Sequence, residues 1–129
     1  MAIELNQIWD MPIKEFHPLP KALLGVGAHD ILGVEAKKLG MTRVLIMTTG
    51  LRGSGIIEEL KGKIEYQGLD VVVFDKVESN PKDYNVMDAA ALYNSEKCDG
   101  IISVGGGSSH DAAKGARVVI AHDGRDINE

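Results

Sequence analysis

Three short runs of apolar residues constrain the fold of this chain more than any other feature. They are "RVLIMTT" from residue 43, "DVVVF" from residue 70 and "GIISV" from residue 100. Their apolar residues are continuous rather than alternating, which is typical of parallel strands covered on both faces. Segments with helical spacing separate the runs, so the pattern predicts α/β units on a mainly parallel sheet with right-handed crossovers.

The remaining segments complete the expected order of elements. Residues 23–26 are expected to form a further short strand, and the helix after it should end near Gly40. Ser54 is placed to cap the next helix. Helical spacing before the run "GIISV" is shown by Val86, Ala89, Ala90 and Tyr93. The last helix is expected over residues 109–121.

Composition limits the class of protein and its partners. A chain of 129 residues with 44% hydrophobic residues can form one domain with a buried core. Its net charge of -5 gives no reason to expect nucleic acid or an anionic membrane as a partner. The apolar runs are too short to span a bilayer.

The compartment and the extent of the chain are indicated by smaller signs. The single cysteine, Cys98, cannot form an intrachain disulfide, and the first residues lack the pattern of a signal peptide. These features favour a cytoplasmic protein. The polar end "DGRDINE" comes after no closing element, so we expect the chain to be a truncated part of a longer protein.

Three consecutive glycines, Gly105, Gly106 and Gly107, come directly after the run "GIISV". In open parallel sheets, ligands bind outside the carboxyl ends of the strands, so a site is expected at this turn. Glycines leave the backbone N–H groups accessible to an anion, and the next helix adds its positive end. The residues therefore predict a site for a phosphate or a pyrophosphate.

A purely structural explanation of the same turn remains open. The residues "SSHD" fit a capping box in which Ser108 and Asp111 only start a helix. Asp111 and Lys114, three residues apart, are equally consistent with an exposed ion pair, although together with His110 they could form a polar cluster near the anion. The G-x-G-x-x-G pattern is not matched, because His110 replaces its third glycine, and the sequence contains no G-x-x-x-x-G-K-[ST] frame of a P-loop.

The segment "GGGSSHDAAK" resembles the G-G-G-S-x-x-D-x-A-K signature of the iron-type, or group III, alcohol dehydrogenases. The segments "FHPLPKALLGVGAHDILGVEAKKLGMTRVLIMTTG" and "VESNPKDYNV" are also similar to this family. Within the family, the chain is most similar to the nicotinoprotein methanol dehydrogenases. The resemblance implies a Rossmann-like α/β fold, the amino-terminal domain of the two-domain fold that the family shares with dehydroquinate synthase.

Residues 1–129 would then form an NAD(P)-binding domain without the helical domain that holds the metal. The resemblance implies a metal-dependent oxidation of small primary alcohols such as methanol to aldehydes by hydride transfer, in a large homo-oligomer. The divalent metal, iron, zinc or magnesium, would be held by the absent domain. No role in metal binding is therefore assigned to His17, His29, His110 or His122.

The resemblance also assigns residues to the cofactor. Gly105, Gly106, Gly107 and Ser108 would lie at the pyrophosphate, and the nicotinamide end would be supported by Asp111 and Lys114. Asn80 matches an asparagine that contacts the nucleotide in the family. Next to Pro81, Asn80 is equally placed to be a helix N-cap with proline at the first helical position.

The end of the strand "VLIMTTG" bears on the choice between NADP and NAD. Many family members have an aspartate there, which binds the ribose 2′-hydroxyl and repels a 2′-phosphate. Here Thr49 or Gly50 replaces it, and Arg52 lies just beyond, within reach of a phosphate. These residues favour NADP(H) over NAD(H), unless Arg52 is only an exposed loop cation.

Two other classes of protein remain alternatives. One is another enzyme on the same scaffold, similar to glycerol dehydrogenase or to dehydroquinate synthase, with different metal ligands and substrates. The other is a non-catalytic domain that binds a nucleotide or a partner protein.

Overall fold

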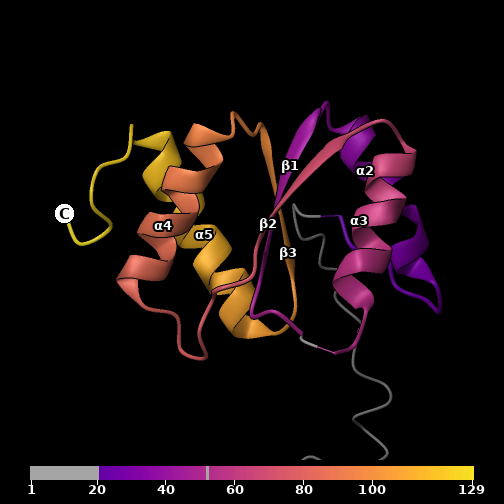
Figure 1. The fold of residues 1–129 in the computed structure, drawn as a ribbon, viewed down its shortest axis with the longest axis horizontal. Helices are drawn as coiled ribbons and strands as arrows, with labels where there is room; N and C mark the ends of the chain where they lie inside the picture. The colour runs from indigo at the N-terminus through magenta and orange to yellow at the C-terminus, as the bar shows by residue number, and fades with distance from the viewer. Residues whose placement is uncertain (1–20, 52) are drawn as a thin grey trace, which may run out of the picture.

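The computed structural model describes residues 21–51 and 53–129. They form a three-stranded parallel sheet in the order β2-β1-β3, covered by helices on both faces (Figure 1). The strands are β1 (Arg43–Thr48), β2 (Asp70–Phe74) and β3 (Gly100–Val104). The three apolar runs are thus confirmed as parallel strands.

Four α-helices and one 3-10 helix surround this sheet within the described residues. Helices α4 and α5 cover one face, and α2 and α3 cover the other (Figure 1). Their bounds are η1 (Ala28–Ile31), α2 (Leu32–Lys38), α3 (Ile56–Tyr66), α4 (Asp83–Ser95) and α5 (Gly107–Ala121). Within the described part of the chain, every helix is too short or too polar to span a lipid bilayer.

Strand β1 forms the centre of the core. Its residues 44–48 are all fully buried. Leu45 and Met47 pack into the core under α4 and α5, whereas Val44 and Ile46 pack into the core under α2 and α3. Because successive side chains of a strand point to opposite faces, burial on both faces requires a continuous apolar run.

The amino edge of the sheet is held by the carboxylate of Asp99. Its Oδ1 accepts the backbone N–H groups of Thr42 and Arg43 at 2.9 and 3.0 Å, and the Asp99 N–H donates to the Arg43 carbonyl at 2.9 Å. The side-chain hydrogen bond from Thr42 holds the pKa of Asp99 below its ordinary value, with further help from these backbone donors. These bonds join the start of β3 to the start of β1.

The strand expected over residues 23–26 is wrong. Leu24 and Val26 are exposed, and the chain turns through Gly25 and Gly27, whose φ angles are 157° and 77°. Carbonyls of the two glycines accept the N–H groups of Ala28 and Asp30, which starts η1. The apolar residues resemble a strand, but the turn geometry of the glycines dominates. The expected end of the next helix near Gly40 is confirmed.

The start of α3 agrees in outline with the expected cap. Ser54 lies one residue before the N-cap, Gly55, and its Oγ accepts the Ile56 N–H at 3.3 Å. The hydroxyl of Ser54 therefore satisfies one of the free N–H groups at the start of the helix, although from outside the N-cap position.

Replacing Gly33 by alanine is expected to destabilise the fold. A Cβ at Gly33 would lie 2.6 Å from the Lys63 carbonyl, because α2 and α3 approach closely there. We expect a loss of about 1–3 kcal/mol in the free energy of unfolding of the full-length protein, measured in urea. Gly62→Ala is the matched control, since Gly62 is exposed in α3 and its Cβ would meet nothing within 4 Å. It should instead stabilise by about 0.5–1 kcal/mol. Equal effects of the two changes would contradict the close contact between α2 and α3.

Candidate functional site: the carboxyl edge of the sheet

The three parallel strands end at one edge, the lower edge of the sheet in Figure 1. Thr48 pairs with Val104, and Met47 pairs with Phe74. The loops after β1, β2 and β3 therefore start side by side. This carboxyl edge holds most of the residues that the sequence assigned to a cofactor, which lie in the three loops and the first turns of α5.

The glycine junction, residues 105–107, contains one glycine that the fold itself requires. Gly105 has a φ of 135°, a conformation that side chains rarely adopt. A Cβ there would also lie 2.7 Å from the Oγ of Ser109. Contacts within the chain thus explain Gly105 without a ligand.

Gly106 and Gly107 have no such explanation. Gly106 has an ordinary φ of -89°, both residues are exposed, and a Cβ at either would meet nothing within 4 Å. Side chains would therefore fit the fold at both positions, but they would fill the space outside the start of α5. Open backbone at this point fits a molecule that approaches the chain closely.

The start of α5 supplies hydrogen-bond donors to this open space. Gly106 is the N-cap and has no side-chain cap, and the His110 N–H is the one that bonds back to the Gly106 carbonyl, at 3.3 Å. The earlier N–H groups of the first turn, from Gly107 onward, have no partner in an α-helix. Together with the positive end of the helix dipole, these groups suit a phosphate group.

The capping box proposed for "SSHD" does not form. Helix α5 begins at Gly107, two residues earlier than expected, so Ser108 lies inside the first turn. The Ser108 Oγ instead accepts the backbone N–H of Asn80 at 3.3 Å. A contact with the neighbouring loop thus replaces the local cap, and it brings Asn80 to the glycine junction.

Asn80 is not the N-cap of the next helix. Helix α4 begins at Asp83 with Lys82 as its N-cap, and Asn80 itself has a left-handed φ of 54°. The alternative of an N-cap before Pro81 is therefore wrong. The structure brings the Asn80 backbone to α5, whereas the contact of its side chain with a nucleotide stays a prediction.

A buried side chain that the sequence analysis did not single out, Asn85, organises this loop. Its side chain is 3% exposed. The Oδ1 accepts the N–H groups of Lys82 at 2.9 Å and Glu78 at 3.4 Å, and the Nδ2 donates to the Lys76 carbonyl at 3.2 Å and the Glu78 carboxylate at 3.0 Å. The pKa of Glu78 is held below its ordinary value, mainly by a hydrogen bond from the Tyr84 side chain and next by the one from Asn85. The only sequence signal of Asn85 is a polar residue in the first turn of a helix.

Three polar residues of α5, His110, Asp111 and Lys114, take part in two separate contacts. Asp111 and Lys114 form an exposed ion pair at 3.7 Å, as the simpler explanation expected. The Nδ1 of His110 lies 2.6 Å from the Oγ of Ser103 at the end of β3. His110 is thus bonded to the strand, and the described residues show no contact that joins it to Asp111 and Lys114 in one cluster.

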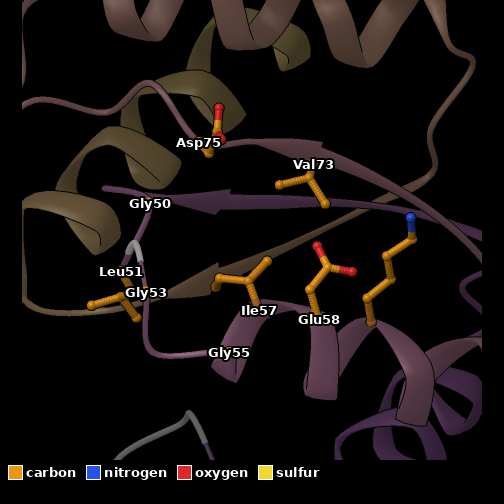
Figure 2. A pocket seen from close by; sticks show the side chains of 9 residues that line it. Gly50, Leu51, Gly53, Gly55, Ile57, Glu58, Val73 and Asp75 are labelled. Atoms are coloured by element: carbon orange, nitrogen blue, oxygen red, sulfur yellow. The ribbon is translucent and has the colours of Figure 1, made fainter.

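A pocket of about 560 Å³ lies between the loop after β1 and the start of α3, on the α3 side of the sheet (Figure 2). Gly50, just after β1, and Asp75, just after β2, both line it. In Figure 2 the side chain of Glu58 extends from α3 toward the sheet. The full lining is Gly50, Leu51, Gly53, Gly55, Ile57, Glu58, Lys61, Val73 and Asp75. Arg52 lies outside the described residues.

Residues 49–50 connect this pocket to the glycine junction. The Thr49 N–H donates to the Oγ of Ser109 at 3.2 Å, and the Gly50 N–H donates to the Oγ1 of Thr48 at 3.2 Å. Thr49 and Gly50 were assigned from the sequence, whereas Ser109 was not, because a serine in a helix has no signature of its own. A long ligand could contact the pocket and the junction together.

Among the described residues, one group has the side chains and spacing of a metal site: His29, Asp30 and Glu59. Both carboxylates already bind the ammonium group of Lys63, in the case of Glu59 at 2.8 Å. This exposed ion-pair group joins η1 to α3 and does not fit a resident catalytic metal. His17 lies outside the described residues.

A family model decides the relationship of the chain to known proteins. The model of the iron-containing alcohol dehydrogenases matches residues 20–129. The chain belongs to this family.

Similar proteins show how far the relationship extends. The chain is 84% identical over 129 residues to the methanol:N,N-dimethyl-4-nitrosoaniline oxidoreductase of Mycobacterium sp. (strain DSM 3803 / JC1), covering 100% of the chain and 30% of that protein. It is 39% identical over 111 residues to the NAD-dependent methanol dehydrogenase of Bacillus methanolicus, covering 85% of the chain and 29% of that protein. The chain therefore spans less than a third of the length of these relatives.

The fold is also that of the family. The structure of NADH-dependent butanol dehydrogenase A from Thermotoga maritima matches with a TM-score of 0.78 at 28% sequence identity, over 91% of this chain and 30% of that one. The parallel sheet with flanking helices is thus the architecture of an iron-containing alcohol dehydrogenase, matched to part of the larger protein.

Replacing Asn85 by alanine is expected to loosen the loop that carries Asn80. Two N–H groups and one carbonyl would lose their partner, which should cost about 1–3 kcal/mol in the free energy of unfolding of the full-length protein. Asn94→Ala, at a position of the same helix away from this loop, is the control and should change it by no more than about 0.5 kcal/mol. A neutral Asn85→Ala would show that the loop does not depend on this side chain.

Proposed function

We propose that this chain is the cofactor-binding part of an NAD(P)-dependent and metal-dependent alcohol dehydrogenase that oxidises small primary alcohols such as methanol. The observation that carries the proposal is the open backbone at Gly106 and Gly107, which neither φ angle nor packing requires. It lies at the start of a 15-residue helix, and the free N–H groups and positive dipole end of a helix start favour a phosphate. The names of the similar methanol oxidoreductases support the class of substrate.

The layout of the carboxyl edge supports a dinucleotide rather than a single phosphate. The pyrophosphate would lie on Gly105, Gly106, Gly107 and Ser108. The adenosine half would enter the pocket that begins at Gly50, and Thr49 would lie between the two. The nicotinamide half would then extend toward the side of α5 that carries Asp111 and Lys114. Ligands of this size commonly bind in pockets of a few hundred Å³ at such an edge.

The contribution of these residues to the reaction is binding and orientation. When bound, nicotinamide accepts a hydride from the carbon that carries the hydroxyl group, and the hydroxyl proton leaves, so that the alcohol becomes an aldehyde. The junction and α5 would fix the pyrophosphate, which holds the nicotinamide ring in one place relative to the alcohol. The described residues do not fit a catalytic metal, so we place the metal on residues outside them.

We infer that the dinucleotide is NADP(H) rather than NAD(H). The end of β1 carries Thr48, Thr49 and Gly50, and none of them offers a carboxylate to the ribose 2′-hydroxyl. Lys61 lines the pocket, where it would have to offset the carboxylates of Glu58 and Asp75, which line it too. Arg52 follows β1 in the sequence. Lys61 and Arg52 are the cations that would face a 2′-phosphate.

The test of the cradle is Gly107→Val in the full-length protein. A Cβ at this position would have nothing within 4 Å apart from its neighbours in the helix, so the fold should persist. The valine would occupy the space proposed for the pyrophosphate, so we expect the affinity for the dinucleotide to fall at least about 100-fold, as for a steric block of a binding site. Isothermal titration calorimetry measures the affinity, and circular dichroism checks the fold.

The matched control is Ala121→Val, which places the same side chain on an exposed position at the other end of α5. It should bind the dinucleotide as the unsubstituted protein does. Undiminished binding by a folded Gly107→Val protein would refute the proposed pyrophosphate site.

A further inference from the structure

We propose that Ser109 is a positioning residue that holds residues 49–50 against the glycine junction and thereby sets the affinity for the adenosine half of the dinucleotide. The inference rests on the proposed function. It concerns a side chain that would touch neither the pyrophosphate nor the adenosine, because it is fully buried.

The position of the Ser109 hydroxyl is defined by two backbone segments. Its Oγ accepts the Thr49 N–H at 3.2 Å. The Oγ also lies close to Gly105, where a Cβ would come within 2.7 Å of the Oγ and 4.0 Å of the Thr49 Oγ1. The first turn of α5, the end of β1 and the glycine junction therefore meet at this one oxygen.

Packing alone does not explain a serine at this position. The other buried residues of α5 are Ala112, Ala113, Ala116 and Val119, so small and apolar side chains fill the contact between α5 and the core. Alanine would serve equally well in place of Ser109 if only volume mattered. The serine differs from alanine by its hydroxyl, and that hydroxyl bonds α5 to the backbone at the end of β1.

The hydrogen bond affects the site because Gly50, the residue after Thr49, lines the pocket. A dinucleotide that occupies both the pocket and the junction needs their separation to match its own length, since the second contact is effectively intramolecular. A shift of residues 49–50 should therefore weaken the adenosine half while the pyrophosphate cradle stays intact.

The experiment compares two ligands in the full-length protein after bound nucleotide has been removed. NADPH reaches both the pocket and the junction, whereas reduced nicotinamide mononucleotide carries a phosphate but no adenosine. For Ser109→Ala we expect NADPH to bind about tenfold more weakly, the effect of one lost hydrogen bond to a backbone donor. The affinity for the mononucleotide, measured by fluorescence titration, should change by less than about twofold.

The control is Ser103→Ala, which removes a hydroxyl that bonds to His110 at the end of β3 rather than to residues 49–50. It should leave both affinities unchanged. Since a misfolded fraction lowers the number of sites rather than their dissociation constant, the ratio of the two affinities separates positioning from a loss of structure.

Each outcome decides between specific alternatives. Equal weakening of both ligands, or no weakening, would overturn the role of Ser109 and leave the proposed function intact. Failure of the unsubstituted protein to bind either NADPH or NADH would overturn the proposed function and this inference with it. Binding of NADH alone would contradict only the choice of NADP(H), and the comparison would then be made with NADH. In case Ser109→Ala does not fold, hydrogen exchange of the Thr49 amide in the unsubstituted protein gives a second test. Protection supports the bond, and exchange as in an exposed amide contradicts it.

Discussion

The burial of strand β1 between two helical layers is the constraint on which the rest of the structure depends. All side chains from Val44 to Thr48 are fully buried, and the strand pairs in parallel with β2 on one side and β3 on the other. Parallel pairing on both sides brings three loops to one edge, although they are far apart in the sequence. The apolar core thus creates the site without contributing a functional group to it.

At this edge, different physical requirements explain why glycine occurs at three neighbouring positions. Gly105 is required by its φ angle and by the hydroxyl of Ser109, so it belongs to the architecture. Gly106 and Gly107 face open space, and a ligand that closely approaches the start of α5 would explain why both lack a side chain. The next two serines join the loops: Ser108 receives the Asn80 N–H, and Ser109 receives the Thr49 N–H. The first turn of α5 therefore organises the edge as a whole.

The sequence predicts the elements with strong periodicity and fails where tertiary contacts override a local pattern. The apolar runs of β1, β2 and β3 were predicted correctly, because burial on both faces leaves a clear signal. The strand predicted over residues 23–26 does not form, since Gly25 and Gly27 adopt turn conformations that outweigh the strand preference of a short apolar run. The caps that the sequence left open as alternatives for Ser108 and Asn80 do not form; instead the Asn80 N–H donates to the Ser108 hydroxyl. The only local signal of Asn85 is a polar residue in the first turn of a helix, and Ser109 has none. The role of Arg52 stays a prediction.

The central claim is that the glycine junction holds the pyrophosphate of NADP(H). Mass spectrometry of the small molecules released by denaturing the purified full-length protein tests it most directly. The account predicts NADP or NADPH, in up to one equivalent per chain. Release of NAD or NADH would keep the dinucleotide site and contradict the inference drawn from Thr49, Gly50 and Arg52. A protein that releases no dinucleotide and binds none when it is added would contradict the claim itself.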